Sequence, residues 1–253
     1  PLLLIVEDHA DMRVFIRSVL EKDFNIIEAS NGKQALDKTL KYLPDFIIAD
    51  IMMPVMDGLE YCKKVKNNFT TSHIPVLLLT AKSSTEVRIE GYNAGADGYI
   101  AKPFDAGLLI ARINNILGAQ TRMHKAFENS MDVKTLNMKE ESQDRKFVDR
   151  IMKIIENNYQ DTAFDVSDLV EKVHMSKSLL HKKLQSLIGQ PAVKVIRSYR
   201  LTKARELILS GRGEQMNISE IAYKVGFNDP KYFTRCFTRH FGITPSKCAE
   251  EVL

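Results

Sequence analysis

The chain has 253 residues, of which 27% are charged and 44% are hydrophobic, and its formal net charge is +4. These values are typical of a folded protein with one large or two ordinary domains, and they exclude a disordered chain. No apolar stretch approaches the ~20 residues that a membrane helix needs. Three widely spaced cysteines, Cys62, Cys236 and Cys248, fit neither a metal site nor a disulfide framework, which favours a reducing cytoplasm.

The charge is distributed unevenly along the chain. Counting Lys, Arg, Asp and Glu, residues 1–118 carry a net charge of −2 and residues 144–253 a net charge of +6. The basic second half predicts contact with a polyanion. Because Pro1 directly precedes a core-type strand, we also expect this chain to be a piece of a longer polypeptide.

Residues 1–118 alternate short apolar runs with amphipathic segments. The runs that are apolar on both faces are Leu2–Val6, Ile26–Ile27, Phe46–Ala49, Val76–Leu79 and Tyr99–Ala101. Apolar residues recur at helical spacing between and after them, as at Met12, Phe15, Ile16 and Val19, and at Leu109, Ile113, Ile116 and Leu117. Five strand–helix repeats predict an α/β doubly wound fold with a five-stranded parallel sheet.

Polar residues follow several of these runs. Glu7 and Asp8 follow the first, Asp50 the third, Thr80 the fourth and Lys102 the fifth. Since the carboxyl ends of parallel strands share one edge, where such sheets bind ligands, we expect these side chains to meet. A carboxylate can attack phosphorus, and three carboxylates close together repel unless a hard cation such as Mg²⁺ lies among them.

This part of the chain resembles a response-regulator receiver domain along essentially its whole length. The motif consists of the acidic pair, Asp50 with Met53-Pro54 and Met56-Asp57-Gly58, then Thr80-Ala81, Gly95-Ala96-Asp97 and Lys102-Pro103-Phe104. The resemblance implies a flavodoxin-like fold in which Asp50 accepts a phosphoryl group that Thr80 and Lys102 contact. It also implies Mg²⁺ held by Glu7, Asp8, Asp50 and the backbone carbonyl of Met52, and a switch that uses Thr80 and Tyr99. His9 is expected to be an exposed loop residue.

The same resemblance predicts what the switch would change. We expect altered surfaces on the helices near 84–94 and 105–117, and a homodimer when the chain is phosphorylated, with Arg88 and Arg112 as candidate interface residues.

Residues 119–143 are polar and weakly periodic, so we predict a linker with some helix. From residue 144 onward the pattern predicts an all-α domain with two helix-turn-helix units. The first is Val166–Val173, a turn at His174-Met175, and Ser176–Ile188; the second is Ile218–Val225, a turn at 226–228, and Asp229–Phe241. Ser167 and Ser219 are the expected helix caps.

Residues 144–253 resemble the AraC-type DNA-binding domain. The signature within Ile218–Pro245 is Ser219-Glu220-Ile221-Ala222, Val225-Gly226-Phe227, Tyr232-Phe233-Thr234-Arg235, Phe237, Gly242 and Thr244-Pro245. Two linked units of this kind can reach successive major grooves of double-stranded DNA. Our candidates for base contacts are Ser178, His181, Lys182, Lys231, Thr234 and Arg235, and our candidates for phosphate contacts are Lys177, Lys183, Arg200 and Arg239. The series Phe233, Phe237 and Phe241 is expected in the core.

We therefore expect a phosphorylation-controlled transcription regulator of a two-component system, with domains at 1–118 and 144–253 joined by 119–143. It is not expected to be an enzyme beyond phosphoryl transfer to its own Asp50. The expected partners are a histidine kinase domain, in the same polypeptide if the chain ends a hybrid regulator, then double-stranded DNA and RNA polymerase. The fragment would be cytoplasmic and the longer protein would span the inner membrane. The alternatives are a free-standing response regulator, a protein-interaction module in a phosphorelay, and a Mg²⁺-dependent phosphatase.

Overall fold

The computed structural model describes residues 1–81, 85–138, 140–210 and 216–250, with only the backbone for residues 85–88 and 129. The chain divides into two compact units, 1–122 and 123–253. The elements in chain order are β1 (Leu2–Val6), α1 (Ala10–Leu20), β2 (Asn25–Ala29), α2 (Gly32–Tyr42), β3 (Phe46–Asp50), α3 (Gly58–Asn67), β4 (Val76–Thr80), α4 (Thr85–Ala94), β5 (Gly98–Ala101), α5 (Ala106–Ser130), the 3₁₀ helix η1 (Val133–Leu136), α6 (Gln143–Asn158), α7 (Val166–Val173), α8 (Lys177–Ile188), α9 (Ala192–Leu209), α10 (Ile218–Lys224), α11 (Pro230–Phe241) and α12 (Pro245–Glu250). Within the described residues, no helix has both the length and the apolarity needed to cross a membrane.

The first unit contains the predicted five-stranded parallel sheet. Its strand order is β2-β1-β3-β4-β5, so the doubly wound fold is confirmed. Val6 pairs with Ala49, Asp50 with Leu79, and Thr80 with Ala101. This register brings the carboxyl ends of β1, β3, β4 and β5 to one edge of the sheet, where the polar residues follow.

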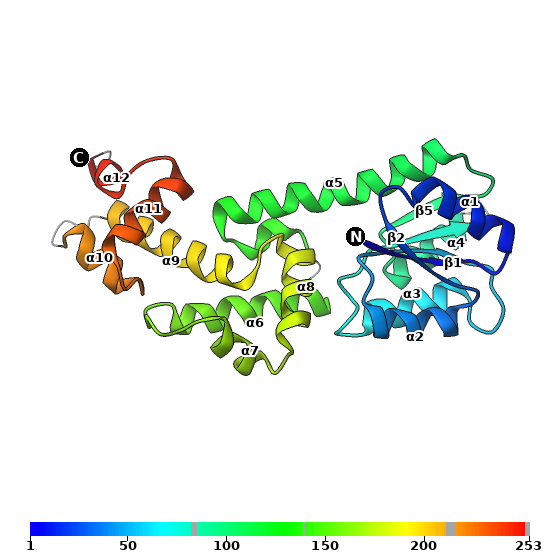
Figure 1. Ribbon diagram of the computed structural model, residues 1–253, viewed down its shortest axis with the longest axis horizontal. Coiled ribbons are helices and arrows are strands. Elements are labelled where there is room, and N and C mark those ends of the chain that lie inside the picture. Colours follow the sequence, from blue (N-terminus) through cyan, green and yellow to red (C-terminus); the bar gives the residue numbers. More distant parts are fainter. Residues whose placement is uncertain (82–84, 139, 211–215, 251–253) are drawn as a thin grey trace. The chain divides into compact units, whose positions relative to one another are not determined.

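Alternate side chains of the strands enter two separate apolar layers. One face packs against α1 and α5 through residues such as Ile16 and Leu109, and the other packs against α2 and α3 through residues such as Ala35 and Tyr61. Figure 1 shows α1 and α2 on opposite sides of the strands. Because both faces are covered, the central strands are apolar throughout, as the sequence pattern indicated.

The loop that follows β3 needs a glycine at one position. A Cβ atom at Gly58 would lie 2.1 Å from the carbonyl oxygen of Asp50, while the Gly58 amide donates to the Ile51 carbonyl at 2.9 Å. In the same loop Val55 has a φ of 72°, which a β-branched residue rarely adopts. The backbone beside Asp50 is therefore both crowded and strained.

The second unit begins inside the segment that we expected as a linker. α5 continues to Ser130, and Phe127, Met131 and Leu136 are buried in a core with α6, α7, α8 and the first half of α9. Most of residues 119–138 is thus helical, and part of it belongs to the core of the second unit. Its polar composition comes from the exposed faces of these helices.

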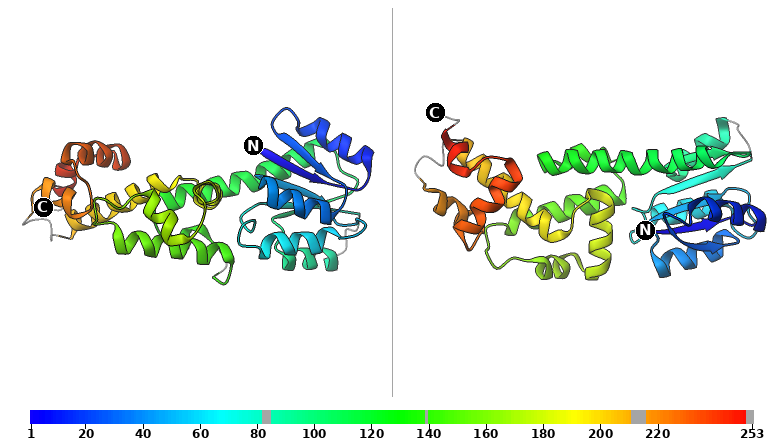
Figure 2. Two further views of the ribbon diagram at one scale, coloured as in Figure 1. Left: turned by 60° about the horizontal axis from the view of Figure 1, so that its bottom comes forward. Right: turned by 45° about the horizontal axis from the view of Figure 1, so that its top comes forward.

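The second half of α9 packs on a further core with α10, α11 and α12, to which Phe233 and Phe237 contribute fully buried rings. Both views in Figure 2 show α10, α11 and α12 gathered near the carboxyl end of α9. The pairs α7–α8 and α10–α11 are the two helix-turn-helix units, and His174 takes a left-handed conformation at the first turn. At the second turn, a Cβ atom at Gly226 would lie 2.1 Å from the Tyr159 carbonyl oxygen.

The caps of the first helices differ from our expectation. Asp165 caps α7 and Asn217 caps α10, and each forms a capping box with the residue three positions later, Asp168 or Glu220. Ser167 and Ser219 lie inside the helices instead. The spacing of a capping box was visible in the sequence and predicts these boundaries better than serine alone.

Candidate phosphoacceptor pocket and nucleic-acid interface

A lysine joins two buried carboxylates at the carboxyl edge of the sheet. The Lys102 ammonium lies 2.7 Å from Glu7 Oε2 and 3.0 Å from Asp50 Oδ2. The Glu7 side chain is fully buried, and burial raises the pKa of Glu7, with the nearby Asp50 acting in the same direction while Lys102 opposes it. Lys102 thus compensates part of the negative charge that the fold concentrates here.

The loop after β1 is fixed by an arginine. Arg13 donates from Nη1 to the carbonyl oxygens of Glu7 at 2.7 Å and Asp8 at 2.9 Å. His9 lies beside the acids with a 76% exposed side chain and hydrogen-bonds Asp8 at 2.9 Å, which raises the pKa of His9. The structure therefore places His9 in an exposed loop, next to an acidic pair whose orientation is set by the backbone contacts of Arg13.

Thr80 and Tyr99 complete this edge. Thr80 is 3% exposed at the end of β4, and its carbonyl oxygen accepts the Lys102 amide at 2.7 Å across the strand pair. The Tyr99 ring lies inward, 8% exposed and edge-on to Tyr92 at 5.0 Å. Burial raises the pKa of Tyr99, and its hydroxyl has no hydrogen-bond partner among the described residues. The Lys102-Pro103 peptide is cis.

The donor set suits a hard divalent cation. Asp50 Oδ1 is buried and, among the described residues, has no hydrogen-bond partner. Ligand atoms of Glu7, Asp8 and His9 lie within 4.8 Å of one another. Lys102 pairs with only two of the three carboxylates, Glu7 and Asp50, so negative charge remains in excess. Oxygen ligands are those that Mg²⁺ prefers. These residues therefore fit Mg²⁺.

The second unit exposes most of the side chains that we expected to contact DNA. On α8, Lys177, Ser178 and His181 are exposed and Lys182 is half-buried. On α11, Lys231, Arg235 and Arg239 are exposed. Thr234 is half-buried, and its hydroxyl donates to the Pro230 carbonyl at 3.0 Å. Arg235 lies over the Tyr232 ring at 5.3 Å.

Two family models match the chain in the order of its two units. The response regulator receiver domain matches residues 3–114, and a helix-turn-helix domain matches residues 169–251.

Residues 3–114 are a response regulator receiver domain, and residues 169–251 are a helix-turn-helix domain of the AraC type.

Two named relatives match all or part of the chain. The chain is 40% identical over 245 residues to a histidine kinase of Formosa agariphila, a match that covers 97% of this chain and 18% of that protein. It is 40% identical over 119 residues to the response regulator ArlR of Staphylococcus aureus, covering 47% of this chain and 53% of ArlR. The chain thus spans less than two thirds of either relative.

Among solved structures, the chain is similar to the signal receiver domain of a signal transduction histidine kinase from Syntrophus aciditrophicus. The identity is 31% with a TM-score of 0.45, and the match covers 48% of this chain and 92% of that structure.

Lys183 of the helix-turn-helix domain does not fit the expected phosphate contact. Its side chain is fully buried, 2.9 Å from Asp144 on α6 and 5.2 Å from the centre of the Phe147 ring. A side chain without exposed surface cannot reach DNA in this conformation, so the expectation is corrected. A signal was present, because Lys183 lies on one helix face with the apolar residues Leu180 and Leu187, three positions before it and four after it.

Arg200 also forms contacts within the domain. Its guanidinium donates to the carbonyl oxygens of Tyr159 at 2.8 Å, Asp161 at 2.6 Å and Phe164 at 3.3 Å. These bonds use Nε and Nη2 and satisfy carbonyl groups of the backbone after α6. Arg200 therefore has a structural role, and its expected phosphate contact stays a prediction that rests on Nη1.

Sequence reasoning missed a group of cations that meet between α9 and α11. Lys194, Arg197 and Arg205 of α9 line one pocket together with Arg235 and Arg239 of α11. The basic residues of α9 lie among apolar ones in the sequence, and only the packing of the two helices shows that they share a surface.

Proposed function

We propose that the chain is the phosphorylation-controlled output of a two-component system, in which the state of Asp50 in the receiver domain governs binding of the helix-turn-helix domain to specific DNA. The observation that carries the proposal is the Lys102 ammonium shared by Asp50 and Glu7 at the sheet edge, in a chain that also has a DNA-binding domain.

The residues of the pocket divide the chemistry among them. Asp50 is the phosphoacceptor, because its buried Oδ1 is open to a new partner while Oδ2 contacts Lys102. Lys102 then pairs with an oxygen of the phosphoryl group, and Thr80 donates its hydroxyl to another. Glu7, Asp8, Asp50 and the Met52 carbonyl would hold Mg²⁺, which supplies positive charge that offsets the charge of the phosphoryl group.

The signal would pass through the residues around Tyr99. A phosphoryl group adds about two negative charges and three acceptor oxygens beside Thr80. Movement of Thr80 toward it changes the space available to the Tyr99 ring, and with it the surface of α4 and α5. Phosphorylation would favour a homodimer through this surface. Arg112 is a candidate contact there, whereas the side chain of Arg88 lies outside the described residues.

The output would be DNA recognition by α8 and α11. Ser178, His181, Lys182, Lys231, Thr234 and Arg235 are proposed to face bases, and Lys177 and Arg239 to face phosphates. RNA polymerase is a further proposed partner.

We also propose that the natural protein includes the histidine kinase that phosphorylates Asp50. The match to part of a histidine kinase supports this proposal. The receiver and helix-turn-helix parts would then act in the cytoplasm, while the complete protein spans the membrane.

The test begins with acetyl phosphate and Mg²⁺. The wild-type chain should gain one phosphoryl group by intact-mass measurement, and Asp50→Asn should gain none. Asp57→Asn is the matched control: Asp57 is an exposed cap that accepts from the Glu60 amide at 2.8 Å, a role that asparagine keeps, so labelling should persist. Labelling of Asp50→Asn would refute Asp50 as acceptor, and rapid turnover of small phosphoesters would favour a phosphatase.

The DNA-binding part of the proposal needs its own measurement. Selection of genomic fragments by the chain should enrich a defined sequence, and Arg235→Ala should relax one position of it by about 1–3 kcal/mol. Binding that does not depend on salt would instead favour a protein-interaction module.

A further inference from the structure

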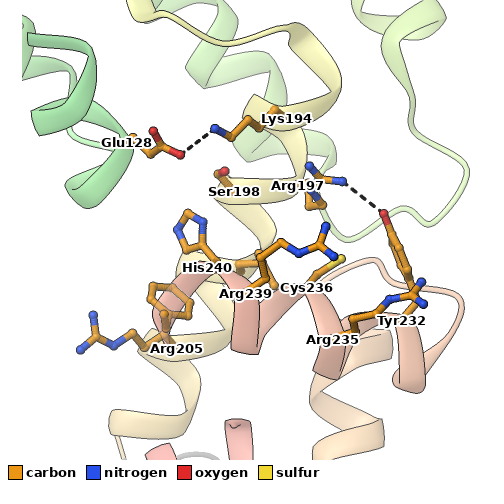
Figure 3. A pocket seen from close by; sticks show the side chains of 12 residues that line it. Glu128, Lys194, Arg197, Ser198, Arg205, Tyr232, Arg235, Cys236, Arg239 and His240 are labelled. Carbon is orange, nitrogen blue, oxygen red and sulfur yellow. Dashed lines mark hydrogen bonds and ion pairs between the residues drawn. The ribbon is translucent and has the colours of Figure 1, made fainter. Parts of the chain in front are cut away.

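The second unit contains a pocket of about 630 Å³ whose lining is strongly basic. Figure 3 shows Lys194, Arg197 and Arg205 on one helix, α9, with Arg235 and Arg239 on α11. The concentration of positive charge in a concave surface predicts an anionic ligand.

One carboxylate lies among these cations. Glu128, near the end of α5, is 2.7 Å from the Lys194 ammonium, and this is the only ion pair between pocket residues in the described part of the chain. The position of Glu128 is fixed by its neighbour Phe127, which is fully buried in the core. Figure 3 shows the Glu128 side chain reaching Lys194 from a different helix.

Three of the four arginines of the pocket contact an aromatic ring or a hydroxyl group, and none of the four has an ion pair among the described residues. Arg197 donates to the Tyr232 hydroxyl at 3.2 Å, and Arg235 lies over the ring of the same tyrosine at 5.3 Å. Arg205 lies 5.1 Å from the centre of the Phe241 ring. These contacts hold the guanidinium groups in place without neutralising them, so their charge remains available to a ligand.

We propose that Lys194 and Arg197 bind a phosphate group of the DNA backbone, and that Glu128 occupies the phosphate position when no DNA is bound. The inference rests on the proposed function and adds to it a contact and an internal competitor. The pocket shares Arg235 with the candidate base-reading face of α11, so a phosphate here would lie close to the bases that α11 reads. Glu128 imitates the charge of that phosphate.

We expect the ion pair between Glu128 and Lys194 to be weak enough for a DNA phosphate to replace Glu128. Both partners of the pair are partly exposed, Lys194 by 38% and Glu128 by 36% of their side chains, and pairs of this kind contribute modestly. If the Glu128 carboxylate must leave before a phosphate enters, it lowers the affinity for DNA. If it stays, it repels the DNA backbone. Removing its charge should therefore strengthen DNA binding.

The experiment measures binding of the full chain to a duplex of about 30 base pairs of random sequence, by fluorescence anisotropy over a series of salt concentrations. Lys194→Gln should reduce the steepness of the plot of log affinity against log salt by about 0.9, the value for one phosphate contact. Lys194→Arg should keep the wild-type steepness, which separates loss of a contact from a folding defect. Glu128→Gln should increase affinity at low salt up to about fivefold.

The decisive comparison measures the effect of Glu128→Gln in two chains, the wild type and Lys194→Gln. Glu128→Gln should strengthen binding less in a Lys194→Gln chain than in the wild-type chain, because the competition for Lys194 is then absent and only the repulsion between Glu128 and DNA remains. The control is Glu206→Gln, which removes a 2.7 Å ion pair with Lys203 on the same helix but outside the pocket, and should leave affinity unchanged within twofold.

The results separate this inference from the proposed function. If the wild-type chain binds duplex DNA but Lys194→Gln retains the full salt dependence, or Glu128→Gln does not strengthen binding, the pocket does not hold a phosphate and the inference is wrong, while DNA binding stands. If the wild-type chain binds no duplex at any salt concentration, either before or after treatment with acetyl phosphate and Mg²⁺, the proposed function fails, and the inference fails with it.

Discussion

The buried ion pair of the helix-turn-helix domain offers a sharp test of the structure. Lys183→Met keeps the aliphatic stem but removes the ammonium that lies 2.9 Å from Asp144. The Asp144 side chain is only 18% exposed, so its carboxylate would lose the ion pair with Lys183 in a largely desolvated position. Removing one member of a buried pair typically costs about 3–5 kcal/mol.

Two features place the expected loss of stability near the lower end of this range. Asp144 retains some solvent contact, and it lies in the first turn of α6, where the helix dipole stabilises a negative charge. We therefore expect a loss of about 3 kcal/mol, or about 10 °C in the melting temperature for a unit of this size. Combining Lys183→Met with Asp144→Leu should recover most of this loss, because both charges of the buried pair are then removed.

The assay is urea unfolding of the full chain followed by far-ultraviolet circular dichroism, with hydrogen exchange to show that α6 and α8 are the elements affected. Lys177→Met is the matched control, since Lys177 is exposed at the start of the same helix. It should leave stability within about 0.5 kcal/mol but lower the salt dependence of DNA binding. A Lys183→Met chain with wild-type stability and reduced salt dependence would refute the buried position.

Three further outcomes follow from the structure. Gly226→Ala should destabilise the helix-turn-helix domain by more than about 1 kcal/mol, because Gly226 has a φ of 88° and the new Cβ would meet the Tyr159 carbonyl; unchanged urea unfolding would contradict this. Chelating Mg²⁺ with EDTA should prevent labelling of Asp50 by acetyl phosphate, and added Mg²⁺ should restore it; labelling in EDTA would disprove the need for the ion. Burial lowers the pKa of His124 below its ordinary 6.5, so its neutral form is favoured in the folded state, and the stability that this contributes is lost as the pH falls from 6.5 through the lowered pKa. Unfolding at pH 7.5 and 5.5 should show a smaller loss for His124→Phe than for wild type, and an equal loss would contradict the assignment.

Much of the receiver fold could be predicted because its signals are local. Each strand is short, apolar on both faces and followed by its polar residue, so the edge at which Glu7, Asp50 and Lys102 meet follows from the parallel arrangement. The inward position of the Tyr99 ring could not be predicted in this way. It depends on the space beside Gly91, where a Cβ atom would lie 1.6 Å from the Tyr99 hydroxyl oxygen.

The helix-turn-helix domain shows more clearly what could not be predicted from the sequence. Periodicity indicated which residues are helical and placed Phe233 and Phe237 in the core, but it treated each cation as exposed. Lys183 is buried because α6 supplies Asp144 from 39 positions earlier in the chain, and Arg200 is engaged because the backbone after α6 passes beside it.

The sequence by itself determined the two kinds of domain, their order and the acidic edge of the sheet, since these depend on runs and spacings within short segments. Only the tertiary structure decided which charged groups are buried, which are paired, and that Glu128 lies among the cations of α9 and α11. The physical reason is that the energy of a charge depends on its surroundings, and in a folded chain those are supplied by residues distant in sequence.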